Sequence, residues 1–202
     1  MRTMPARIGG RLCLDFVNTV DPRSATEPQD YFGDYADVID WIAAADIALP
    51  RSLSGLRRTA KADRRSAAQA HARIVEMRQS LHAVLLASVN GERVHPGNLR
   101  LLNIALGESI GHRMLLPDER GGVAEGWRRS DSLDQVLWPV AIDAWDLLTE
   151  PELARVRQCP IADGGCGWLF LDSSRSGNRR WCDMRTCGNR AKVRAHYSRA
   201  AG

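Results

Sequence analysis

The stretches CPIADGGC (residues 159–166) and CDMRTC (residues 182–187) contain four of the five cysteines of this 202-residue chain. The first pair encloses six residues, the second encloses four, and the 15 residues 167–181 separate the two pairs. Two close thiol pairs in one short segment indicate a structural zinc site, because zinc binds four thiolates tetrahedrally and without redox chemistry. The sequence therefore predicts one zinc ion, with no open position for catalysis, held by Cys159, Cys166, Cys182 and Cys187.

Two disulfides are the alternative interpretation of the same cysteines, and four cysteines allow three pairings. The chain begins MRTMPARIGG and has no apolar run of the length that a signal peptide or a membrane helix needs. We therefore expect a cytoplasmic protein without a membrane partner. Its thiols would be kept reduced, which favours zinc over disulfides.

The charge of the chain is unevenly distributed. The net charge is +4, and residues 151–202 contain ten Lys and Arg against four Asp and Glu, which leaves −2 for residues 1–150. A basic end on an acidic body indicates a nucleic-acid contact at that end. A segment of this size also buries too little apolar surface to fold without a metal or a disulfide. We predict two domains, a mostly helical one over residues 1–150 and a zinc module over residues 151–202.

Hydrophobic periodicity predicts a mainly helical body with one small β-hairpin. Helices are expected at residues 35–47 with Asp34 as N-cap, at 66–89 with a stop at Asn90-Gly91, and after Pro96. A further helix is expected at 132–149, kinked or split by Pro139. Residues 112–116 and 123–127 flank a polar connection and predict the hairpin. Residues 12–20 are either a strand or the start of a helix, and residues 51–65 are the least ordered candidate.

The zinc module has a different pattern. Residues 168–171 (WLFL) predict a strand, residues 173–178 a polar turn, and residues 180–181 a return strand. From residue 184 the sequence becomes helical, which places the second cysteine pair at a helix N-terminus. The predicted module is a β-hairpin followed by a basic helix, similar to a treble clef, with Trp168 and Trp181 in its small core.

The cysteine segment resembles a known family. The stretch from Cys159 to Arg194, with CGNR at residues 187–190, is similar to the CGNR-type zinc finger. The motif LCLDFVNT at residues 12–19 resembles the ABATE domain that precedes this finger. The family is described as bacterial transcription regulators linked to stress. The resemblance implies zinc on the four cysteines and DNA binding by the finger.

Basic side chains around the second cysteine pair are the predicted DNA contacts: Arg179, Arg180, Arg185, Arg190, Lys192 and Arg194. Arginines in such a cluster bind phosphates and can pair with guanine in the major groove. Neutralisation of the negative zinc–thiolate group is one alternative role, and a protein-binding surface on a zinc-stabilised module is another. Asn189 is interpreted as a backbone cap in preference to a contact with adenine.

Two polar residues interrupt the apolar run of the LCLDFVNT motif. Asp15 and Asn18 are candidates for one corner of a small-ligand pocket, and a buried hydrogen-bonded pair or a helix cap is the alternative. Cys13 between leucines is expected to be a core residue. Motifs for a phosphate loop, a nucleophile elbow or a zinc protease are absent from the sequence, so we expect a non-enzymatic protein. For the body, a small-molecule effector or a homodimer is the expected partner.

Overall fold

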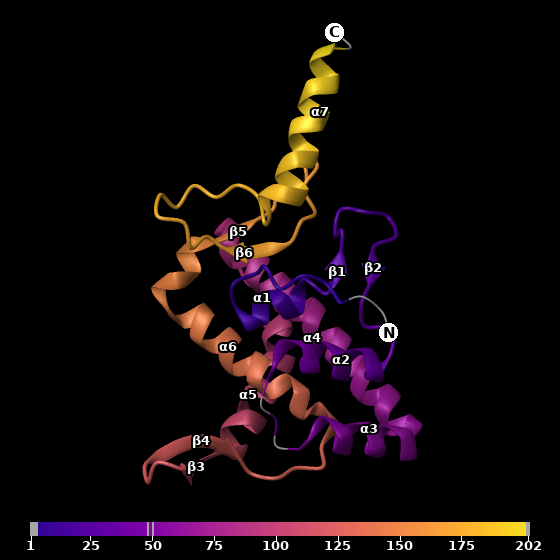
Figure 1. Ribbon diagram of the computed structural model, residues 1–202, viewed down its shortest axis with the longest axis vertical. Helices are drawn as coiled ribbons and strands as arrows, with labels where there is room; N and C mark the ends of the chain where they lie inside the picture. Colours follow the sequence, from indigo (N-terminus) through magenta and orange to yellow (C-terminus); the bar gives the residue numbers. More distant parts are fainter. Residues whose placement is uncertain (1–3, 48, 50, 201–202) are drawn as a thin grey trace.

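The computed structural model describes residues 4–47, 49 and 51–200, without the side chains at 195, 196 and 198–200. Figure 1 shows a helical body with the finger at one end, from which the last helix projects. The helices are α1 Leu12–Val17, α2 Tyr35–Ala45, α3 Leu53–Ala62, α4 Arg64–Asn90, α5 Pro96–His112, α6 Trp138–Thr149 and α7 Asn189–Ala200. None of the described helices has the length and apolar character required to cross a bilayer.

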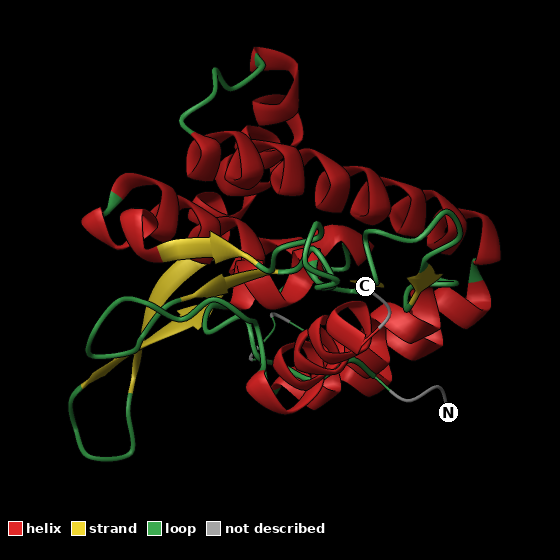
Figure 2. Cartoon of the chain, turned by 90° about the horizontal axis from the view of Figure 1, so that it is seen from above, coloured by secondary structure: helices red, strands yellow, loops and turns green. Residues whose placement is uncertain are grey.

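The strands form three separate antiparallel pairs. They are β1 Val20–Asp21 with β2 Gln29–Asp30, β3 Arg113–Pro117 with β4 Val123–Trp127, and β5 Val156–Gln158 with β6 Leu169–Leu171. Figure 2, seen from above, shows that helices make up most of the molecule. The fold class is therefore mainly α with small two-stranded sheets, as predicted.

Local sequence signals explain the long helices. The carboxylate of Asp34 accepts the backbone N–H groups of Ala36 and Asp37 at 2.8 and 3.1 Å and caps α2. Helix α4 ends at Gly91, whose φ of 67° is the left-handed conformation that glycine adopts at a helix end. Before α6, a 3₁₀ turn at Leu133–Leu137 leads into Pro139 in the first helical turn. These three predictions are confirmed, including the split at Pro139.

Two local predictions are wrong. Residues 51–65 are not poorly ordered, because α3 occupies most of them. Ser52 caps this helix through Gly55 N–H at 3.2 Å, and the fully buried Leu56 anchors it to the body. The return strand at residues 180–181 is also absent, and β6 instead pairs with β5, which lies before the first cysteine.

The body and the finger share one apolar core. Phe16, Phe32 and Trp41 form an aromatic group with ring centroids 5.7–5.9 Å apart. Three finger-strand residues, Val156, Leu169 and Leu171, are buried in the same cluster as these aromatic rings. The strands of the finger therefore belong to the hydrophobic core of the body.

Candidate metal centre and nucleic-acid interface

The four predicted cysteines come together in space. Their sulfur atoms lie within 4.8 Å of one another, all four are buried, and all are free thiols. The Sγ atoms of Cys166 and Cys182 are 3.4 Å apart, and those of Cys182 and Cys187 are 3.7 Å apart. Four sulfurs at about 2.3 Å from a tetrahedral zinc lie about 3.8 Å apart, so this cluster fits the ion. The disulfide interpretation is wrong.

The first two cysteines are positioned by the β5–β6 pair. Cys159 follows β5 and donates its N–H to the carbonyl of Trp168 at 2.8 Å, which extends the ladder toward the metal. The connecting loop turns back through Gly165, whose N–H donates to Pro160 O at 2.8 Å. A Cβ on Gly165 would lie 2.7 Å from Cys159 Sγ, so this close approach requires glycine.

Of the other two cysteines, Cys182 precedes the helical turn Met184–Gly188 and Cys187 lies within it, and this turn leads into α7. Asp183 caps this turn by accepting the Arg185 N–H at 3.0 Å. Asn189 donates through Nδ2 to the carbonyl of Arg185 at 3.1 Å, as expected for a backbone cap. The position of the second pair at a helix N-terminus is thereby confirmed.

The thiols interact strongly with one another. Hydrogen bonds from Cys166 and Cys182 lower the pKa of Cys159 well below that of a free thiol. The same contacts, together with burial, raise the pKa of Cys182 well above that of a free thiol. A divalent cation replaces these shared protons when it binds, because zinc takes cysteine as the thiolate.

A small apolar core surrounds the sulfur atoms. The buried Trp168 and Phe170 and the partly buried Trp181 pack with the four cysteines. Trp168 also donates from Nε1 to the carbonyl of Val20 at 2.8 Å. Both tryptophans are therefore core residues of the finger, as predicted.

The LCLDFVNT motif attaches the finger to the body. The side chain of Asn18 donates to Leu169 O at 2.8 Å and accepts from Leu169 N at 3.0 Å, so it pairs with β6 as another strand would. Asp15 accepts the N–H of Gly9 at 2.8 Å, and the Gly9 carbonyl accepts the N–H of Leu171 at 2.7 Å. Burial raises the pKa of Asp15, an effect that the Gly9 N–H and Arg7 oppose.

The prediction of a ligand pocket at Asp15 and Asn18 is therefore corrected. Both side chains are almost fully buried, and their polar atoms bond to backbone or to Arg7. They are polar because each must pair with buried backbone groups of a neighbouring segment. Asp15 and Asn18 are therefore buried hydrogen-bonding residues, as the alternative interpretation of the sequence proposed.

Arg179 and Arg180, which were predicted as DNA contacts, interact with groups inside the finger. Arg179 donates to the carbonyls of Trp181 and Cys182 and lies over the ring of Phe170 at 4.7 Å. Arg180 pairs with Asp163 at 2.6 Å and lies over the ring of Trp181. The half-buried Arg179 is thus a structural residue, and we withdraw it as a nucleic-acid contact.

The other four basic residues lie on or just before α7 and are exposed: Arg185, Arg190, Lys192 and Arg194. Arg190 is near Asp21, where its charge opposes the effect of burial on the pKa of that carboxyl group. The guanidinium of Arg194 lies over Gly164 in the first metal-binding loop. Helical geometry places Lys192 on the side of α7 opposite Arg190 and Arg194.

Comparisons with known proteins agree with this architecture. The family model named ABATE, described as "Putative stress-induced transcription regulator", matches residues 10–151. The chain belongs to the ABATE family. In this ABATE protein a second family model, the CGNR zinc finger, matches residues 155–200 and contains all four cysteines. A search of curated proteins finds no match.

One feature of the ABATE body was missed from the sequence. Helices α2, α3 and α4 surround an open cavity whose cationic rim comes from the stretch predicted to be least ordered. The spacing of Arg57 and Lys61 was the available signal, because four residues place both side chains on one face of α3, and Arg64 follows at the start of α4.

Proposed function

We propose that this protein is a DNA-binding transcription regulator without catalytic activity, in which the zinc finger presents α7 to the double helix. The observation that supports the proposal is an exposed helix without acidic residues that projects from the finger (Figure 1). Its width suits the major groove of B-DNA, which admits one α-helix.

The distribution of charge on α7 favours this mode of binding. Lys192 lies on one side of the helix, and Arg190 and Arg194 lie on the other. A helix in the groove has a phosphate backbone along each side, so cations on both sides contact both strands. The zinc site fixes the start of α7, since Cys187 lies in the turn that leads into it. The helix is therefore oriented before DNA arrives.

The test measures binding of the zinc-loaded full chain to a pool of random-sequence duplexes by fluorescence anisotropy over a series of salt concentrations. Phosphate contacts by the four exposed basic residues on or just before α7 give a slope of log K against log salt of about −3.6; Arg180 is not counted because it pairs with Asp163. The variant Arg190→Gln with Lys192→Gln is expected to reduce the magnitude of that slope by about 2. Selection and sequencing of the bound duplexes from the same pool then shows whether the protein prefers particular base sequences.

A matched control removes the same charge elsewhere. Arg128 and Arg129 are exposed and follow β4, at the end of the body far from the finger (Figure 1). The variant Arg128→Gln with Arg129→Gln is expected to bind DNA like the unmodified protein. Equal weakening in both variants, or a flat salt response, contradicts the proposal.

A zinc-stabilised protein-binding module is the second candidate function. Three apolar side chains on the last turn and helix favour it, because Met184, Val193 and Tyr197 are 48%, 54% and 69% exposed. Under this alternative, the unmodified protein does not bind DNA. Charge removal at Arg190 and Lys192 then has no effect on the binding of its protein partner. The random-duplex experiment separates the two functions.

The body is proposed to sense a small molecule or to form a homodimer. The cavity between α2, α3 and α4 supports the first role. The hairpin β3–β4 supports the second, because Leu115 and Val123 are 75% and 67% exposed on it. Sedimentation of the full chain over a range of concentrations, with and without Leu115→Ser, tests the dimer.

A further inference from the structure

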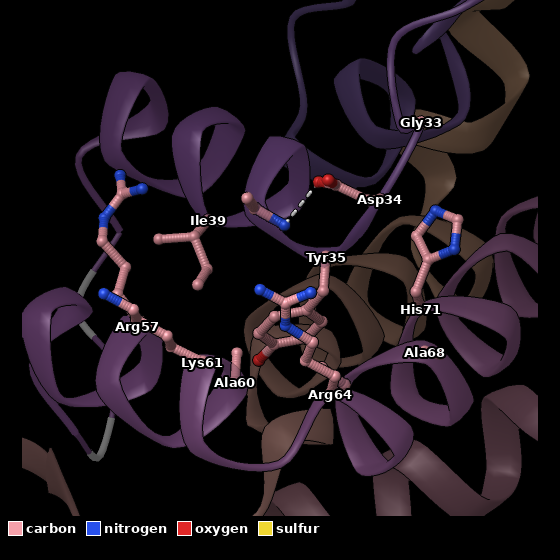
Figure 3. Close-up of a pocket in the computed structure, with 12 residues that line it drawn as sticks. Gly33, Asp34, Tyr35, Ile39, Arg57, Ala60, Lys61, Arg64, Ala68 and His71 are labelled. Carbon is pink, nitrogen blue, oxygen red and sulfur yellow. Dashed lines mark hydrogen bonds between the residues drawn. The ribbon is translucent and has the colours of Figure 1, made fainter.

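The open cavity in the body has the size of a small-molecule site. Its volume is about 710 Å³, and α2, α3 and the first turns of α4 line it. Pockets for drug-sized ligands typically span about 300–1,000 Å³. Figure 3 shows side chains from all three helices directed toward this space.

The inner wall of the cavity is apolar and fixed. Tyr35, Ile39 and Ala67 line it, and each is almost fully buried. The hydroxyl of Tyr35 donates to Leu133 O at 2.7 Å, so its polar end points away into the body. These residues close the cavity from behind, and the apolar surface that stays open to a ligand comes from Ala60 and Ala68, which calls for an apolar or aromatic group there.

The rim of the cavity is cationic. Arg57, Lys61 and Arg64 lie along it from α3 to the start of α4 (Figure 3). Arg57 pairs with Asp40 at 2.5 Å, whereas no ion pair within the described residues includes Lys61 or Arg64. Two cations without a carboxylate partner can bind an anion directly.

Arg64 is the first residue of α4. The N-terminus of this helix is already capped by Asp63, whose carboxylate accepts the Ser66 N–H at 2.9 Å, so an anion in the cavity would be bound by the side chains of Lys61 and Arg64 and not by the helix end. The one acidic residue that lines the cavity, Asp34, uses its Oδ1 atom to cap α2.

We propose that this cavity binds a small organic anion, with its carboxylate, sulfonate or phosphate group at Lys61 and Arg64 and its apolar part against Ala60 and Ala68. The proposal refines the sensing role proposed for the body. Its test uses no DNA, so its failure and the failure of DNA binding are separate results.

The probe is 8-anilinonaphthalene-1-sulfonate, an aromatic anion whose fluorescence rises in apolar surroundings, titrated into the zinc-loaded full chain. The variant Lys61→Gln with Arg64→Gln is expected to weaken binding at least tenfold. The matched control is Arg58→Gln with Arg65→Gln, which removes the same charge from exposed residues of α3 and α4 outside the cavity. It is expected to change the dissociation constant less than twofold.

Two further measurements test the remaining parts of the site. Ala68→Phe fills the cavity without a change of charge and is expected to weaken binding of the sulfonate probe at least fivefold. The uncharged analogue N-phenyl-1-naphthylamine is expected to bind Lys61→Gln with Arg64→Gln as it binds the unmodified protein. Circular dichroism establishes that each variant is folded.

Equal loss of affinity in the Lys61 and Arg64 variant and in its control would overturn the proposal, because the effect would then be one of net charge. Absence of saturable probe binding to the unmodified protein, or full affinity in Ala68→Phe, would overturn it as well.

Discussion

Replacement of Asn18 by alanine tests the attachment of the finger to the body. The Asn18 side chain satisfies both the N–H and the carbonyl of Leu169 in a buried site. An unsatisfied buried polar group costs about 1–3 kcal/mol, so loss of both hydrogen bonds is worth roughly 2–6 kcal/mol. We expect the free energy of unfolding to fall by about 3 kcal/mol, since water entering the vacated volume recovers part of that cost.

The assay is thermal unfolding of the zinc-loaded protein followed by circular dichroism. For a chain of this length, each kcal/mol corresponds to about 2–4 °C, so the midpoint is expected to fall by roughly 6–12 °C. The control is Asn178→Ala, an exposed asparagine of the finger loop, with an expected shift below 2 °C. A midpoint unchanged by Asn18→Ala would refute the assignment of this side chain as the partner of β6.

Three further perturbations have defined outcomes. Cys187→Ser is expected to abolish stoichiometric zinc, measured by mass spectrometry of the metal, while Cys13→Ala retains it because Cys13 lies in the body core away from the metal. Arg78→Ala is expected to cost about 3 kcal/mol in urea unfolding, since this fully buried arginine pairs with Asp30 at 2.5 and 2.7 Å. Arg73→Ala on the same helix is expected to cost under about 1 kcal/mol, because Arg73 is 47% exposed where it pairs with Asp134. Burial, with a smaller effect from Arg23, lowers the pKa of His82 to about 4, so folding favours the neutral imidazole. Its contribution to stability is complete above the unfolded pKa of about 6.5 and is lost as the pH falls toward 4, by at most about 3 kcal/mol. His82→Gln is expected to flatten the dependence of unfolding free energy on pH in this range.

Much of the body follows from short-range sequence signals. Asp34, Asn90-Gly91 and Pro139 each act within one helical turn, so the elements that they bound were predictable. Residues 51–65 were misjudged because their composition of Arg, Ser and Gly hides the cap at Ser52 and a single buried leucine. That leucine becomes an anchor only through contacts with other helices, and a local pattern does not contain them.

The metal site was predictable for the same reason, since cysteine spacing is a local property and the chemistry of zinc restricts the ligands. The roles of other polar residues were not. Asn18 and Leu169 are 151 positions apart, and only the fold shows that one satisfies the other. In the sequence, Arg179 does not differ from its basic neighbours. Only the structure shows that it donates to the carbonyls of Trp181 and Cys182.

The bond between Asn18 and Leu169 also has a consequence for synthesis on the ribosome. Asn18, the C-cap of α1, is translated 151 residues before its partner in β6. At about 5–20 residues per second, the nascent chain waits roughly 8–30 s before Asn18 can form these hydrogen bonds. Ribosome-bound intermediates should therefore be susceptible to proteolysis near α1 until β6 has emerged from the exit tunnel.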